Sequence, residues 1–187
     1  MIITIVTGNP HKVKEVSSFF SGIAEIEHVN LDIPEIRHDD VGAVAYEKAQ
    51  AAWEHLQRPL IVDDTGFFIY ALGGFPGTCA AYCMKTIGND GILRLMKGVR
   101  DRSAYFETVI AYASEKGIEL FSGRIDGDVL EEARGLGGFG YDPIFSSGEK
   151  SLAEMTLSEK STSSHRGRAL AAFRDWFVSH HPDYNNR

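Results

Sequence analysis

The stretch TGNPHKVKE, residues 7–15, joins a short apolar run at residues 2–6 to a segment with helical periodicity. The apolar run predicts a buried strand, and the apolar spacing that follows predicts a helix over about residues 10–20. A turn from a strand into a helix leaves backbone N–H groups unpaired, and the helix dipole favours an anion there. Neither the Walker pattern nor G-x-G-x-x-G is present. The turn therefore indicates either a phosphate site of another kind or an ordinary helix cap formed by Asn9.

Composition limits the classes of protein to which the chain can belong. It has 187 residues, 43% of them hydrophobic, and a formal net charge of −7 at pH 7. This length favours a single domain over residues 1–187. The acidic balance argues against nucleic acid as a partner, because general binding to it needs a basic surface. No segment resembles a membrane span or a signal peptide, so we expect a cytoplasmic protein with no membrane partner. The two cysteines, Cys79 and Cys83, are expected to be reduced and buried.

Strand-like and helical segments alternate along the rest of the chain and predict a mixed α/β fold. The expected elements are strands at about residues 25–31, 60–62 and 67–70, a helix at about 41–56, two short helices within 79–97, a hairpin of strands at 103–113 and 118–130, and a helix from about 164. Asp39 or Asp40 is placed to cap the helix at 41–56. The last helix is expected to bury its apolar side chains, among them Phe173, Trp176 and Phe177.

Two adjacent carboxylates, Asp63 and Asp64, follow the apolar run at residues 60–62. Strand ends in α/β folds often carry ligand sites, and Mg²⁺ is bound by a few carboxylates together with substrate phosphate oxygens. Neighbouring strand residues face opposite sides, so Asp63 and Asp64 are expected to have different roles. Glu35 and the aspartates of the helix cap supply further carboxylates for such a metal site. The alternative is that Asp-Asp-Thr-Gly is only a turn.

A glycine-rich loop and a basic segment form two more candidate sites. In GFGYDP, residues 138–143, glycines flank an aromatic ring on which a nucleobase can stack, although Phe139 can equally belong to the core. In EKSTSSHRGR, residues 159–168, His165 and Arg166 open the last helix. Cations at that end of a helix are unfavourable unless an anionic ligand offsets them. The alternative is a solvated basic turn.

In this order and combination, the motifs resemble those of the inosine triphosphate pyrophosphatase family, the XTP/dITP diphosphatases. The resemblance extends from Thr7 to about Phe177. It implies an elongated mixed β-sheet flanked by helices, in two lobes with the active site in the cleft between them. It also implies a homodimer that uses Mg²⁺ to hydrolyse ITP, dITP or XTP to the monophosphate and pyrophosphate. One departure is TCAAY, residues 78–82, where many bacterial members carry an arginine.

The resemblance further assigns roles to residues of this chain. Asp64 matches the metal ligand and expected general base, and Glu35 matches a second metal ligand. The residues implied to bind the nucleotide are Thr7, Gly8, Asn9, Lys12, Lys48, Thr65, Phe139, Gly140, Tyr141, Asp142, Lys160, His165 and Arg166. The lysines and Arg166 are expected to offset the charge of the triphosphate. Phe139 is expected to stack on the base, and His165 with Arg166 to donate to its keto oxygen.

Two other functions remain open at this stage. A Maf-like pyrophosphatase for modified pyrimidine nucleotides would catalyse the same kind of cleavage, and its substrates would distinguish it. A catalytically silent nucleotide sensor is the other alternative. The presence of both Lys12 and Asp64 argues against a silent site.

Overall fold

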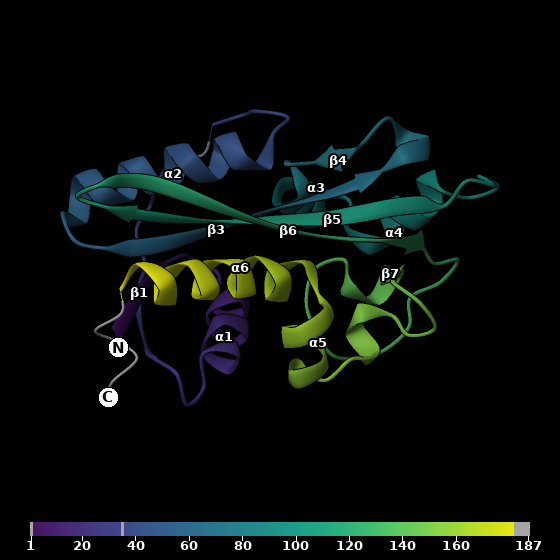
Figure 1. Ribbon diagram of the computed structural model, residues 1–187. Helices are drawn as coiled ribbons and strands as arrows, with labels where there is room; N and C mark the ends of the chain where they lie inside the picture. The colour runs from purple at the N-terminus through teal and green to yellow at the C-terminus, as the bar shows by residue number, and fades with distance from the viewer. Residues whose placement is uncertain (1, 35, 182–187) are drawn as a thin grey trace.

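The computed structural model describes residues 2–34 and 36–181, which form a seven-stranded mixed sheet with helices on both faces (Figure 1). The strand order is β2-β1-β3-β5-β6-β7, and β4 pairs with β3 outside this path. β1 is parallel to β2 and β3, and the other named strand pairs are antiparallel. The expected α/β fold with an elongated mixed sheet and flanking helices is confirmed.

The elements lie close to their expected positions. The strands are β1 (Ile2–Val6), β2 (Glu25–Val29), β3 (Leu60–Ile69), β4 (Pro76–Gly77), β5 (Ser103–Ser114), β6 (Gly117–Val129) and β7 (Phe145–Ser146). The helices are α1 (Pro10–Phe19), α2 (Val41–Leu56), α3 (Ala80–Thr86), α4 (Gly88–Leu95), α5 (Leu157–Ser163) and α6 (His165–His180), with short 3₁₀ turns at Tyr70–Leu72, Asp142–Ile144 and Leu152–Glu154. Within the described residues, no helix combines the length and the hydropathy needed to cross a membrane.

β3 is one strand of ten residues, whereas the sequence predicted two strands, at about residues 60–62 and 67–70. It pairs with β5 along its whole length, from Leu60 opposite Ala113 to Ile69 opposite Ala104. Asp63 and Asp64 therefore lie in the middle of a strand. The prediction of two separate strands was wrong, and the alternative of a turn at Asp-Asp-Thr-Gly is excluded, because long-range pairing and burial override the turn preference of these residues.

One edge of β3 is open over residues 63–66. β1 pairs with β3 only up to Val62, and β4 begins to pair at Phe67. Between these points no other described strand pairs with that edge. Instead, Lys12 Nζ donates to the main-chain carbonyl of Asp63 at 2.8 Å. The β1–α1 turn thus brings its lysine to a gap in the sheet.

The core is divided among both faces and one end of the sheet. α2 covers one face with Val41, Ala45 and other buried side chains, and α1 and α6 cover the opposite face (Figure 1). A third cluster, rich in aromatic side chains, lies beneath α3 and α4 at the far end. Trp176 is half-buried, and Cys79 is exposed while Cys83 is buried, so the expectation that all three are buried was wrong in part.

Gly123 in β6 allows α6 to approach the sheet closely. A Cβ atom at this position would lie 2.1 Å from the carbonyl oxygen of His165 and 2.4 Å from the amide nitrogen of Ala169. Such distances are impossible for a real side chain, so only glycine permits the contact. The absence of a side chain at position 123 therefore allows the first turn of α6 to pack directly against the backbone of β6.

Asp40, not Asp39, caps α2: its Oδ1 accepts from the amide of Gly42 at 2.7 Å. We expect Asp40→Ala to lower the free energy of unfolding by about 1 kcal/mol, because one N-terminal amide of the helix loses its acceptor. Urea denaturation of both alanine variants measures this difference. Asp39→Ala is the matched control, and an equal loss in the two variants would contradict the assignment of the cap.

Candidate functional site

A cavity of about 360 Å³ lies at the open edge of β3 and is lined by side chains from α1, α2, α3, α6 and the glycine-rich loop. Of the predicted site residues, those that line it are Asn9, Lys12, Lys48, Asp64, Thr65, Phe139, Gly140, Tyr141, Asp142, His165 and Arg166. Thr7, Gly8 and Lys160 are not among the lining residues. Glu35 lies outside the described residues. The structure thus brings most of the sequence motifs to one cavity.

The β1–α1 turn forms the helix cap that its sequence predicts. The Asn9 side chain accepts from the amide of His11 at 2.9 Å, and Pro10 begins the helix. Thr7 Oγ1 accepts from the amide of Asn9 at 3.1 Å. Thr7 therefore supports the turn, and Asn9 is the member of this pair that lines the cavity.

Asp63 and Asp64 face opposite sides of β3, as the strand periodicity predicts. Asp63 faces α1 and α6, where it accepts from Arg166 Nε at 2.6 Å and lies 2.5 Å from Lys12 Nζ. Asp64 faces α2, where Lys48 Nζ donates to it at 2.7 Å. Asp63 is enclosed by its cations, and of these two aspartates Asp64 is the one that lines the cavity.

The pKa values of these two carboxylates are shifted in opposite directions. Burial alone would raise the pKa of Asp63, but Arg166 and Lys12 outweigh it and hold this pKa well below the usual range. Burial prevails at Asp64, whose pKa is raised in spite of the nearby Lys48 and Lys12. A buried carboxylate whose charge is incompletely offset can bind a cation or accept a proton.

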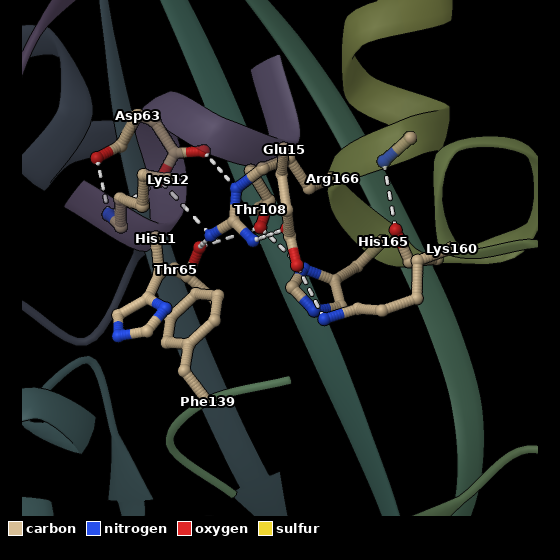
Figure 2. A network of polar contacts seen from close by, with 12 residues as sticks. His11, Lys12, Glu15, Asp63, Thr65, Thr108, Phe139, Lys160, His165 and Arg166 are labelled. Atoms are coloured by element: carbon tan, nitrogen blue, oxygen red, sulfur yellow. Dashed lines mark hydrogen bonds and ion pairs between the residues drawn. The ribbon is translucent and has the colours of Figure 1, made fainter. Parts of the chain in front are cut away.

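Glu15 in α1 connects the basic segment to the rest of the site (Figure 2). It accepts from Lys160 Nζ at 2.5 Å and from Arg166 Nη1 at 2.6 Å, and all three side chains are buried. Burial alone would raise the pKa of Glu15, but the two cations lower it overall. Sequence reasoning missed this residue. The sequence feature that could have indicated Glu15 is its position one helical turn after Lys12 in α1.

The four cations expected to offset a triphosphate are already paired with carboxylates. The pairs are Lys12–Asp63, Lys48–Asp64, Lys160–Glu15, Lys160–Asp142, Arg166–Glu15 and Arg166–Asp63. Four cations face four carboxylates, so the site has no formal net charge when all of them are ionised. The expectation that these cations offset the charge of a triphosphate alongside Mg²⁺ stays a prediction, and the ion pairs add that each cation already has a carboxylate partner.

The glycine-rich loop presents one aromatic ring to the cavity and places the other in the core. Asp142 Oδ2 accepts from the amide of Phe139 at 2.7 Å, which holds the loop in a tight turn. The Phe139 ring stacks on His11 with a centroid distance of 5.0 Å (Figure 2). The Tyr141 ring is buried, and its hydroxyl donates to the carbonyl of Ala80 at 2.9 Å. Phe139 is therefore the candidate for stacking, with His11 as a neighbour that the sequence did not indicate.

His165 begins α6 and is almost fully buried. Its Nδ1 lies 2.6 Å from Thr108 Oγ1, and its ring stacks on Phe106 at a centroid distance of 4.8 Å. Burial and the neighbouring Arg166 charge hold the pKa of His165 well below its usual range. The ring is thus neutral at physiological pH. Thr108 was missed by sequence reasoning, because its proximity depends on the register of β3 and β5.

Comparison with known proteins identifies the family of the chain and agrees with its fold. Residues 3–176 match the model of the Ham1 family. The chain is 43% identical to a dITP/XTP pyrophosphatase of Thermococcus kodakarensis over 179 residues, which cover 94% of this chain and 97% of that protein. It is 44% identical to a protein of the same name from Methanopyrus kandleri over 182 residues, covering 95% of this chain and 96% of that one. A HAM1 protein structure from Coxiella burnetii is similar with a TM-score of 0.81 at 28% identity, covering 96% of this chain and 99% of that chain. The family resemblance is confirmed, and the chain belongs to the Ham1 family.

Proposed function

We propose that this protein hydrolyses ITP, dITP and XTP to the nucleoside monophosphate and pyrophosphate, with Mg²⁺ as cofactor. The observation that carries the proposal is Asp64, a buried carboxylate of raised pKa in a cavity shared by the β1–α1 turn and the glycine-rich loop. The relatives named dITP/XTP pyrophosphatase support this choice of substrates over the Maf-like alternative. We also propose that the chain is a single cytoplasmic domain that forms a homodimer.

The charge balance of the site supports a need for a divalent cation. No group of three or more potential metal-binding side chains occurs within the described residues. A single carboxylate such as Asp64 fits Mg²⁺, which keeps several waters and shares the substrate's phosphate oxygens. Glu35, which the sequence predicts as a second ligand, lies outside the described part of the chain. When bound, Mg²⁺ would offset the phosphate charge that the paired lysines and arginine leave uncompensated.

The chain's own residues would then position the reactants for attack on the α-phosphorus. Phosphoryl transfer depends mainly on positioning and charge stabilisation. The β1–α1 turn supplies Asn9 and Lys12 for the phosphate tail, and Lys48 lies beside Asp64. Asp64 would orient the attacking water and accept its proton, which its raised pKa favours. Pyrophosphate is the leaving group.

A panel of nucleoside triphosphates with Mg²⁺ tests the proposal directly. ITP, dITP and XTP should give the monophosphate and pyrophosphate, and UTP and modified pyrimidine triphosphates should react poorly. Chromatography of the nucleotide products and separate assays for pyrophosphate and orthophosphate make the distinction. Release of the diphosphate with orthophosphate would refute the proposed bond cleavage. Tight binding without turnover would favour the nucleotide sensor.

Base selection should depend on His165. Hypoxanthine and xanthine carry a keto oxygen at position 6, where adenine carries an amino group. Arg166 already donates to Asp63, Glu15 and Thr65, which leaves His165 as the better candidate donor to that oxygen.

We therefore expect His165→Ala to narrow the gap in kcat/KM between ITP and ATP by about tenfold, mainly through lost ITP activity, because one selective hydrogen bond is removed. Phe139→Ala is the comparison variant. It should weaken all purine nucleotides alike, since stacking does not depend on base identity. The measurement is kcat/KM for ITP, XTP, GTP and ATP. An equal fall for all four in His165→Ala would assign His165 to phosphate binding or structure instead.

A further inference from the structure

A chain of hydrogen bonds connects Arg166 to His165 through two threonines (Figure 2). Arg166 Nη2 donates to Thr65 Oγ1 at 3.1 Å. Thr65 Oγ1 lies 2.6 Å from Thr108 Oγ1, and the same Thr108 atom lies 2.6 Å from His165 Nδ1. Thr65 and Thr108 are directly opposite each other in the β3–β5 register, so the sheet itself holds the two hydroxyls together.

The direction of this chain follows from the chemistry of its first member. A guanidinium group can only donate, so the Thr65 oxygen is an acceptor from Arg166. A hydroxyl that accepts from a cation becomes a better donor, and Thr65 can then donate to Thr108. Thr108 in turn gives its single hydroxyl proton to His165 Nδ1. In this direction, from Arg166 to His165, both threonine hydroxyl protons are donated to an acceptor.

The opposite direction leaves a proton without a partner. If His165 Nδ1 carried the proton, it would donate to Thr108, and Thr108 would donate to Thr65. The Thr65 oxygen would then accept from both Thr108 and Arg166, and its own proton would have no acceptor among the hydrogen bonds of the described residues. The guanidinium charge at one end of the chain also disfavours this arrangement.

His165 is the last member, and its second nitrogen is free for a ligand. The ring is neutral, so one nitrogen carries a proton and the other accepts. Nε2 has no hydrogen-bond partner among the described residues, and His165 lines the cavity. With Nδ1 as the acceptor, Nε2 must carry the proton.

We propose that Thr108, with Thr65, is a positioning residue that fixes His165 as the Nε2–H tautomer and keeps a hydrogen-bond donor facing the cavity. The consequence for substrate choice rests on the function proposed above, whereas the tautomer does not. A fixed N–H donor can form a hydrogen bond to a keto oxygen, whereas an amino group at the same position is itself a donor and is disfavoured. Selection of keto purines would thus depend on a threonine that does not itself need to touch the base.

The tautomer can be measured without any substrate. In the ¹⁵N-histidine-labelled protein, the two ring nitrogens of His165 have distinct chemical shifts according to which one carries the proton. His165→Ala identifies these signals among the seven histidines of the chain. We expect a protonated Nε2 and an unprotonated, hydrogen-bonded Nδ1. A protonated Nδ1 in the wild-type protein would overturn the proposal, whatever the enzyme assays show.

Substitution of Thr108 tests whether the tautomer and its orientation depend on the hydroxyl. Thr108→Val removes the hydroxyl at similar volume, and Thr108→Ser keeps it. We expect the valine variant to shift the Nδ1 signal and to reduce the ratio of kcat/KM for dITP over dATP by about tenfold, the size of one lost hydrogen bond. Serine should restore both quantities.

A matched control separates this effect from general loss of a buried hydroxyl. Thr4 is buried in β1, and its Oγ1 donates to Glu27 at 3.0 Å, away from the cavity-lining residues. Thr4→Val should leave both the His165 signals and the selectivity ratio unchanged. An unchanged ratio in Thr108→Val, or an equal change in Thr4→Val, would overturn the proposed role. If wild-type protein releases no pyrophosphate from dITP, the function fails while the tautomer result stands.

Discussion

Asp64→Asn is expected to lower kcat for dITP by about 10³-fold, the typical effect of losing a general base. Asparagine keeps the shape of the side chain but can neither accept the proton of the attacking water nor offset a cation. KM should change little, because the nucleotide is held mainly by other groups of the cavity. Steady-state kinetics with dITP at saturating Mg²⁺ provide the measurement. A variant with wild-type kcat would contradict the role of Asp64.

A magnesium titration of the same variant separates the two roles proposed for Asp64. If excess Mg²⁺ restores most of the lost activity, Asp64 acts chiefly as a metal ligand. If activity stays low at every concentration, the carboxylate acts chiefly on the water. The free energy of unfolding of Asp64→Asn in urea should equal or slightly exceed that of the wild type. Burial raises the pKa of Asp64, so its charge is unfavourable in the folded state, and the neutral amide removes this cost.

Asp63→Asn is expected to affect stability more than kcat, in contrast to Asp64→Asn. We expect a loss of about 3–5 kcal/mol in the free energy of unfolding. Asp63 is buried between Arg166 and Lys12 and forms an ion pair with each of them. A neutral amide would leave Lys12 without its carboxylate partner and the buried Arg166 with Glu15 as its one remaining carboxylate partner. Urea denaturation monitored by circular dichroism gives the difference from wild type.

Asp64→Asn is the matched control for this substitution, because the two positions are adjacent and the chemical change is identical. In protein that remains folded, Asp63→Asn should lose much less kcat than Asp64→Asn. Equal losses of stability in both variants, or equal losses of kcat, would contradict the division of roles between the two faces of β3.

Much of the fold could be predicted because its elements have strong local patterns. The apolar stripe of α2 and the hairpin of β5 and β6 depend on residues close together in sequence. The same holds for the N-cap of α6, Ser164, whose hydroxyl accepts from the amide of Gly167 at 3.1 Å. β3 was misjudged at Asp63–Gly66 because its continuity comes from pairing with β5, more than thirty residues further along the chain. The turn preference of those four residues is a local property, and the long-range pairing with β5 outweighs it.

The candidate site was predictable only where a motif residue points into the cavity. Lys160 belongs to a motif, yet it is paired with Glu15 and does not line the cavity. Tyr141 lines the cavity, but most of its ring packs in the core. Glu15 ends the stretch at residues 7–15 but received no role there, and Thr108 lies in no motif that the sequence displays. Thr108 enters the site because it faces Thr65 across two strands, and such a relation cannot be inferred from a single sequence before the pairing is known.

The ten-residue pairing of β3 with β5 has a consequence for how this protein can change in evolution. Because side chains alternate between the faces of a sheet, a single-residue insertion or deletion before Asp63 would exchange the environments of the two aspartates. Asp64 would then meet Arg166, and Asp63 would face α2. Changes of chain length should therefore be tolerated in the exposed β5–β6 turn at Glu115 and Lys116, but not within β3.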